Sequence, residues 1–442
     1  MKYLFNGATH RGRVRERNED YLLMDDALGL FLVCDGMGGH SAGNVASELV
    51  ATTIAAILRE NAEVLTAYVA DPGNRARRKV KSLLERAVQD ACQAVWQAAA
   101  KDKSKQGMGT TVALMLVCGR NAFVAHVGDS RVYLVRNHTL CQLTEDHTLL
   151  NDMLKHGTTS PDKAKAHPYS NALTRAVGIQ PAVQPDILHV EIMLGDRFLI
   201  CSDGLTAYVQ GDDLLSLLKR PGIKGLADAL ISEANERGGR DNVTALILAM
   251  EEESRGPTTI EHSAMVAQKI EVLRRIPMFA DFDFKQMAKL VEVGEVRVVR
   301  KGEVLIREGE ADASLYVILY GASQVLRGGE IVNHLGEGNY FGEMSMLDKV
   351  PRSATVVASE AMTILFLDRE RFLGVLQTDA GMATKVMWSI AQKLNRRLRE
   401  ADDEIHRLRR ELGMPTQRDA DEREDDRAGA AQDSRAGAAR GD

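Results

Sequence analysis

The chain has 442 residues, and its 56 Lys and Arg against 62 Asp and Glu give a formal charge of −6 at pH 7. Hydrophobic residues make up 45% and charged residues 27%, the balance of folded globular domains, which excludes a wholly disordered chain. This length predicts two or three domains, and the mildly acidic charge disfavours a general binder of nucleic acids.

The five cysteines are scattered, odd in number and include no CxxC pair, so they support neither a disulfide framework nor a zinc ribbon. No apolar run reaches the ~20 residues that a membrane span needs, and the N-terminus has no apolar leader segment. We therefore expect a cytoplasmic protein that binds neither membranes nor nucleic acids.

Residues 1–252 carry clusters of short apolar strands and clusters of helical pattern. The helical patterns are GNVASELVATTIAAILRE and the long segment RKVKSLLERAVQDACQAVWQAAA. The expected strands are LGLFLVCD, TVALMLVC, NAFVAHVG, RVYLVR, DRFLICSD and VTALILAM. Because strands and helices come in clusters, the pattern predicts a layered α+β domain.

A polar break at residues 251–259 marks a linker, so that residues 253–276 are predicted to form a linker and a connecting helix. Residues 277–380 then carry short β-type runs separated by glycine turns. This spacing is typical of a small barrel or β-roll.

Residues 381–412 are predicted to form one long helix. Its apolar residues recur in steps of four and three, as in the seam of a coiled coil, at Met387, Ala391, Leu394, Leu398, Ala401, Ile405, Leu408 and Leu412. The seam fits a homodimer, and it equally fits a helix packed on its own barrel. Residues 413–442 have almost no apolar side chains and are expected to be disordered.

Acidic residues stand where the predicted core strands of the first domain begin or end. These are Asp20, Asp35, Asp129, Asp203 and Asp241. Carboxylates that converge there would repel one another and lose hydration, at a cost of several kcal/mol each. Divalent cations shared among them would remove this cost, and all-oxygen ligands favour Mg²⁺ or Mn²⁺ over Zn²⁺.

The ordered series RGRVRERNED, VCDGMGGH, GMGTT, HVGDSR, LTEDHTLL, LTRAVG, CSDGL and DNVT resembles the metal-dependent serine/threonine protein phosphatases of type 2C, in particular their bacterial branch. The resemblance spans about residues 7–249. It implies a four-layer α-β-β-α sandwich with a two-metal centre in a cleft between the sheets. Such an enzyme hydrolyses phosphoserine and phosphothreonine in proteins, the products of a serine/threonine kinase.

The resemblance also implies roles for individual residues of the metal centre. Asp35 corresponds to the carboxylate that bridges the two metals, and Gly36 offers its backbone carbonyl to one of them. Asp203 and Asp241 correspond to further ligands. Asp20 would act through bound water, with Glu19 as a weaker candidate.

Two further residues complete the implied site. Asp129 matches the position that helps to hold a third, weakly bound metal in bacterial members, and Arg15 matches the residue that binds the substrate phosphate.

The segment 145–171 resembles the flap beside the catalytic cleft, and its histidines are expected at the surface. A cysteine-based phosphatase is disfavoured, because neither Cys34 nor Cys201 is followed by the C-x5-R arginine.

The second landmark is EGNYFGEMSMLDKVPRSATV, in which a helix starting near Gly342 and the later Arg352 would form an anion site. Together with RKGEVLIREGEADASLYVILYGASQVL, it resembles a cyclic nucleotide-binding domain over about residues 277–379. The resemblance implies that Gly342 and Arg352 hold the cyclic phosphate and that Glu343 binds the ribose 2′-hydroxyl. Ser353 would lie by the phosphate or base, and the ligand would be cAMP or cGMP.

The leading interpretation is a Mn²⁺- or Mg²⁺-dependent phosphatase that is regulated by a cyclic nucleotide. Two alternatives stay open at this point. The barrel could be a docking or dimerisation module that binds no nucleotide, or the whole chain could be a non-catalytic nucleotide sensor.

Overall fold

The computed structural model describes residues 2–38, 42–155, 172–251, 270, 272–311, 313–342 and 351–412. The chain divides into two compact units. One comprises residues 1–273 with 283–369, and the other comprises residues 274–282 with 370–442.

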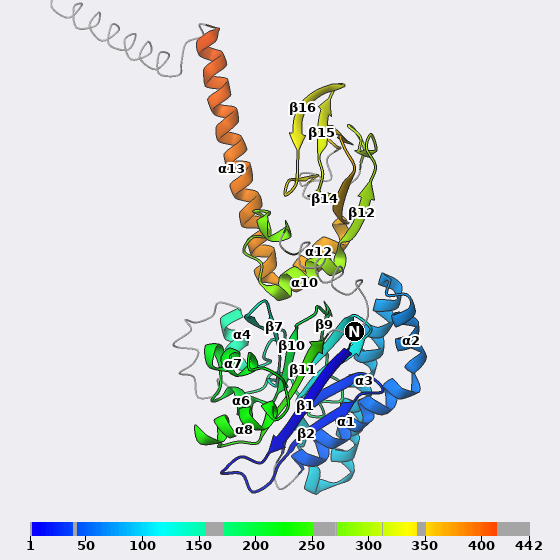
Figure 1. Ribbon diagram of the computed structural model, residues 1–442, viewed down its shortest axis with the longest axis vertical. Coiled ribbons are helices and arrows are strands. Elements are labelled where there is room, and N and C mark those ends of the chain that lie inside the picture. The colour runs from blue at the N-terminus through cyan, green and yellow to red at the C-terminus, as the bar shows by residue number, and fades with distance from the viewer. Residues whose placement is uncertain are drawn as a thin grey trace, which may run out of the picture. The chain divides into compact units, whose positions relative to one another are not determined.

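Two antiparallel sheets form the centre of the N-terminal part (Figure 1). The first has the order β1-β11-β10-β7-β8, with β1 (Lys2–His10), β7 (Arg131–Arg136), β8 (Thr139–Gln142), β10 (Arg197–Cys201) and β11 (Val243–Glu251). The second has the order β2-β3-β5-β6-β9, with β2 (Asp20–Asp25), β3 (Leu30–Met37), β5 (Val112–Cys118), β6 (Asn121–Val127) and β9 (Asp186–Glu191). The short β4 (Gly109–Thr110) pairs with β3.

Helices cover the outer face of each sheet, so this part is a four-layer α-β-β-α sandwich, as the sequence predicted. On one side lie α1 (Gly43–Glu60), α2 (Ala62–Ala70) and α3 (Asn74–Lys101), and on the other α6 (Asp203–Thr206), α7 (Gly211–Leu218) and α8 (Leu226–Glu236) (Figure 1). A separate helix, α4 (Leu149–Lys155), follows β8. Among the described residues, apolar clusters hold the layers together, one under each helical layer and one between the sheets.

The central strands are apolar on both sides because both faces of each sheet are covered. In β11, every residue from Val243 to Met250 is buried. Cys34 and Cys201 are buried strand residues, and all five cysteines are free thiols. Burial is the main cause that raises the pKa of the Cys201 thiol to about 12, so it is a poor nucleophile.

Residues 295–367 form two four-stranded antiparallel sheets around a small apolar core, which confirms the predicted β-roll. One sheet contains β12 (Glu295–Val299), β14 (Leu315–Tyr320), β17 (Tyr340–Phe341) and β19 (Met362–Leu367), and the other β13 (Val304–Ile306), β15 (Ser323–Arg327), β16 (Glu330–Leu335) and β18 (Thr355–Ala358). A helix that the sequence did not predict, α10 (Phe284–Val293), precedes them.

The second unit contains α12 (Arg369–Thr378) and α13 (Ala380–Glu411), which matches the predicted long helix. Phe279 packs beside Phe282 and Phe372 within this unit. Most of the connecting helix expected at residues 260–276, and the tail 413–442, lie outside the described residues. None of the helices in the described ranges combines the length and apolar character required to traverse a bilayer.

Candidate active site

The strand pairing brings the five aspartates of the sequence analysis to one edge of the two sheets. Asp20, the first residue of β2, lies directly opposite Asp35 near the end of β3. Asp203 follows β10 and opens α6, while Asp241 lies just ahead of β11, which pairs antiparallel with β10. Asp129 lies in the turn that joins β6 to β7.

These carboxylates are close enough to perturb one another. Burial, together with the charges of Asp20, Asp203, Asp129 and Asp241, raises the pKa of Asp35 well above its ordinary value. Burial also raises the pKa of Asp129 to about 7, with Asp203 and Asp146 adding to the shift. Such shifts mark a cluster in which several negative charges are unfavourable without a compensating cation.

Asp20 is fixed by two hydroxyl groups that sequence reasoning missed. Ser202 and Thr244 donate hydrogen bonds of 2.8 and 2.6 Å to Asp20 Oδ2. Asp20 Oδ1 is buried and accepts no hydrogen bond from the part of the chain that the structure describes. Burial raises the pKa of Asp20 to about 7, although the two hydroxyl groups lower it. The motifs CSDGL and DNVT contain both hydroxyl residues, so the signal was present in the sequence.

The backbone around Asp35 is held by the GMGTT motif. The Asp35 amide donates to Thr111 Oγ1 at 3.0 Å, and the Asp35 carbonyl accepts from the Thr111 amide at 2.9 Å and from Thr110 Oγ1 at 2.8 Å. The next residue must be glycine, because a Cβ on Gly36 would lie 2.2 Å from the Gly43 carbonyl oxygen. The close approach fixes the peptide that carries the predicted Gly36 carbonyl ligand.

Arg15 lies at the carboxylate cluster, where its guanidinium is 2.7 Å from Asp241 Oδ2. The hydrogen bond to Asp241 raises the pKa of Arg15 despite partial burial, and the charges of Asp241, Glu19 and Asp35 act in the same direction. Asn242 anchors the adjoining loop, because its Nδ2 donates to the carbonyls of Arg11 and Arg17.

The turn that carries Asp129 is held by the segment after β8. Arg131 forms a two-pronged ion pair with Asp146, with its Nη2 2.6 Å from Asp146 Oδ2. The His147 amide donates to the Gly128 carbonyl at 2.8 Å, and the Gly128 amide donates to His147 Nδ1 at 3.1 Å. The expectation that His147 is a surface residue is therefore wrong, since it is buried against this turn. His156 and His167 lie outside the described residues.

The donor set fits hard divalent cations. Its side chains are carboxylates, and Asp20 Oδ1 is buried with no hydrogen-bond partner among the described residues. Burial, together with the neighbouring carboxylates, raises the pKa values of Asp20, Asp35 and Asp203. Within the described residues, no three His, Cys, Asp or Glu side chains are arranged to hold an ion by themselves. Ions here would therefore also need water and backbone carbonyls, a coordination that suits Mg²⁺ and Mn²⁺.

The predicted anion site of the β-roll is described in part. Arg352 is buried, and its Nη1 donates to the Gly342 carbonyl at 3.2 Å and its Nη2 to the Ser314 carbonyl at 2.8 Å. The positive φ of Gly342, 89°, favours glycine there. Ser353 is exposed beside Arg352, while Glu343 lies outside the described residues.

Comparison with family models assigns two parts of the chain. Residues 6–245 match the model described as protein phosphatase 2C, and residues 296–379 match that of the cyclic nucleotide-binding domain.

Several curated proteins are similar to this chain. The serine/threonine phosphatase stp of Listeria monocytogenes is 36% identical over 244 residues, which cover 54% of this chain and 93% of that protein. The serine/threonine protein phosphatase PstP of Mycobacterium tuberculosis is 30% identical over 345 residues, 72% of this chain and 63% of that protein. A crystal structure of the latter enzyme, PstP/Ppp, has a TM-score of 0.49 at 34% identity, covering 57% of this chain and 99% of that chain.

Proposed function

Because the chain belongs to the protein phosphatase 2C family and is a protein serine/threonine phosphatase, we propose that it hydrolyses phosphoserine and phosphothreonine with water activated by two Mn²⁺ or Mg²⁺ ions. The observation that carries this proposal is the convergence of Asp20, Asp35 and Asp203 with Asp241 at one sheet edge. The substrates would be phosphoproteins produced by a serine/threonine kinase.

Asp35, the Gly36 carbonyl, Asp203 and Asp241 would hold the two ions, and Asp20 would support them through water. Divalent ions bound here supply a water nucleophile at neutral pH and offset the charge on the phosphoryl oxygens. Asp129 would contribute to a third, weaker site.

Arg15 would bind the substrate phosphate, because its planar guanidinium can donate two parallel hydrogen bonds to phosphate oxygens. Its position 2.7 Å from Asp241 places this donor beside the carboxylates. The charge of Arg15 would thus hold the phosphate next to the ions and limit its motion relative to the attacking water.

A phosphoserine peptide assay tests this function. We expect Mn²⁺-dependent release of phosphate by the wild type, and loss of at least a hundredfold in Asp203→Asn, which keeps the shape of the side chain but removes its charge. Asp90→Asn, a change at an exposed position of α3, serves as the control and should retain full activity. Equal activity with and without added metal after chelation would overturn the proposal.

A second proposal concerns residues 296–379, which would bind a cyclic nucleotide that regulates the phosphatase. The match to the cyclic nucleotide-binding model and the contact between Arg352 and Gly342 support it. Gly342 and Arg352 would hold the phosphate, Glu343 the ribose 2′-hydroxyl and Ser353 the phosphate or base, with cAMP slightly favoured over cGMP. Equilibrium binding of labelled cAMP and cGMP, followed by phosphatase rates at saturation, tests both steps. Absence of binding would leave the barrel as a docking module.

A homodimer through α13 is the third proposal, and it is favoured by the exposure of the predicted seam. Leu398 and Leu412 are 63% and 72% exposed. In a parallel pair, Glu404 would face Arg409 of the second copy, five residues further along, with opposite charge. Sedimentation equilibrium should show a dimer that Leu398→Glu converts to a monomer, whereas a monomeric wild type would contradict the proposal.

A further inference from the structure

Helix α10 lies outside both matched family regions, between residue 245 and residue 296. A capping box starts it: the Asp283 carboxylate accepts from the Gln286 amide at 2.8 Å, and the Gln286 side chain accepts from the Asp283 amide. Reciprocal capping of this kind satisfies two backbone groups at the helix start and sets where the helix begins. The first turn, which includes Phe284 and Lys285, is therefore well defined.

Contacts at both ends of α10 hold it on the phosphatase sandwich. Phe284, at the start, is buried in the apolar cluster between the two sheets, and the guanidinium carbon of Arg136 lies 5.1 Å from its ring centroid. Glu292, near the end, forms an ion pair with Lys81 of α3, and its carbonyl accepts from Arg77 at 3.3 Å. Two separate anchors of different chemistry specify the position of the helix.

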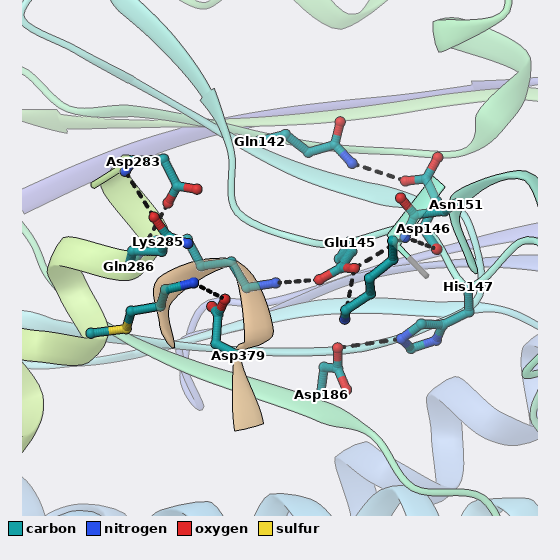
Figure 2. Close-up of polar contacts among 12 residues, drawn as sticks. Gln142, Glu145, Asp146, His147, Asn151, Asp186, Asp283, Lys285, Gln286 and Asp379 are labelled. Carbon is teal, nitrogen blue, oxygen red and sulfur yellow. Dashed lines mark hydrogen bonds and ion pairs between the residues drawn. The ribbon is translucent and has the colours of Figure 1, made fainter. Parts of the chain in front are cut away.

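Between these anchors, Lys285 reaches the root of the predicted flap. Its Nζ lies 3.5 Å from Glu145 Oε2, while Glu145 Oε1 accepts from Asn151 Nδ2 at 3.1 Å and from Lys155 Nζ at 3.0 Å (Figure 2). Asn151 and Lys155 belong to α4, the last described element before residues 156–171. The Glu145 carboxylate thus joins α10 to α4.

Glu145 is also next to the residues that hold the Asp129 turn. Arg131 donates to both carboxylate oxygens of Asp146. Gln142 also donates to Asp146 at 2.9 Å (Figure 2). His147, the following residue, is hydrogen bonded to Gly128 in both directions. A change in the position of Glu145 would therefore be passed to the turn that carries Asp129 on one side and to α4 on the other.

We propose that Lys285 is a positioning residue through which the region after the phosphatase domain orders the root of the flap. While α10 is docked, Lys285 fixes Glu145, which in turn fixes α4 and the described start of the predicted flap. The inference rests on the proposed phosphatase function for its effect on substrates, but the ordering of residues 145–155 does not depend on catalysis.

The first test measures that ordering by amide hydrogen exchange in the full-length protein. We expect Lys285→Met to speed exchange in residues 143–155 by about fivefold, the order of a partly exposed ion pair. Lys285→Arg keeps the charge and should exchange like the wild type. Exchange in residues 143–155 that is the same in Lys285→Met and wild type overturns the proposal, whether or not the protein is active.

The second test is charge reversal with kinetics on a phosphopeptide. Lys285→Glu should raise KM by about fivefold with kcat within twofold of wild type, because the residue orders the flap and does not touch the substrate. Lys285→Arg, which keeps the positive charge beside Glu145, should retain the KM of the wild type. A purely structural role would lower the amount of active enzyme, and hence the apparent kcat, without changing KM. An unchanged KM in Lys285→Glu, or a KM raised equally in Lys285→Arg, contradicts the positioning role. Failure of the proposed function would instead appear as a wild type without metal-dependent activity.

Discussion

The aspartate cluster makes an unusual prediction for Asp20→Asn: the variant should be more stable than the wild type without metal. Burial raises the pKa of Asp20 from 3.8 to about 7. The folded protein therefore binds this proton more tightly than the unfolded chain does. The stabilisation that this proton contributes is fully present below pH 3.8 and is lost as the pH rises through about 7. At pH 8 the wild type carries the whole cost of an ionised Asp20.

The size of the effect follows from the shift. About three pKa units at about 1.4 kcal/mol each give an upper limit of about 4 kcal/mol. Asparagine carries no charge and keeps an oxygen that can accept from Ser202 and Thr244. We expect a gain of about 1 to 4 kcal/mol, or several degrees in the melting temperature of the phosphatase part, at pH 8 in a chelator.

The assay is thermal unfolding of both proteins at pH 5 and pH 8, with chelator and with Mn²⁺. The advantage of Asp20→Asn should shrink at pH 5, and Mn²⁺ should stabilise the wild type more than the variant. Asp90→Asn, at an exposed position, is the control and should follow the wild type throughout. A variant that is less stable than the wild type in chelator at pH 8 would refute the reasoning.

Other predictions follow from neighbouring contacts. Mn²⁺ should bind more tightly as the pH rises from 5.5 to 8, because the ions displace the protons that Asp20 and Asp129 retain up to about pH 7. Calorimetric titrations that show the same Mn²⁺ affinity at both pH values would contradict this prediction. Asp146→Asn should lower kcat by about tenfold by weakening the ion pair with Arg131 that supports the Asp129 turn. Phosphatase rates compared with those of Asp90→Asn, a change at an exposed position of α3, check this prediction. Arg352→Ala should abolish nucleotide binding. It should also destabilise the β-roll by about 1 to 3 kcal/mol, because two backbone carbonyls lose the hydrogen bonds that Arg352 donates. Binding of labelled cAMP and cGMP tests the first effect, and denaturant unfolding tests the second.

The central strands could be predicted from the sequence because both of their faces are buried. Continuous apolar runs such as those of β5 and β11 predict strands that are covered on both faces. The strands β1 and β2 were missed, since they combine exposed, half-buried and polar positions and include Gly7. Their pairing with β11 and β3 is a tertiary property that local patterning does not carry.

The site was predictable in part because the aspartates stand at strand ends, and strand pairing brings such ends together. The supporting hydroxyls of Ser202 and Thr244 were less visible, because serine and threonine are common beside turns and strands. His147 was misjudged because its neighbours are polar, whereas its burial comes from hydrogen bonds to Gly128, 19 residues earlier in the chain. Helix α10 was missed although Asp283 and Gln286 have the spacing of a capping box, a local signal for a helix start. The burial of Phe284 in the cluster between the two sheets is a tertiary contact that the local sequence does not carry.

The most direct test of the metal centre is the number of Mn²⁺ ions bound by the metal-free protein, measured by calorimetric titration at pH 8 for the wild type and for Asp35→Asn. The wild type should take up at least two ions with phosphatase activity rising in parallel, and Asp35→Asn should lose at least one of them and nearly all of the activity. Equal stoichiometry and equal turnover in the two proteins would contradict the claim that the gathered carboxylates exist to hold divalent ions.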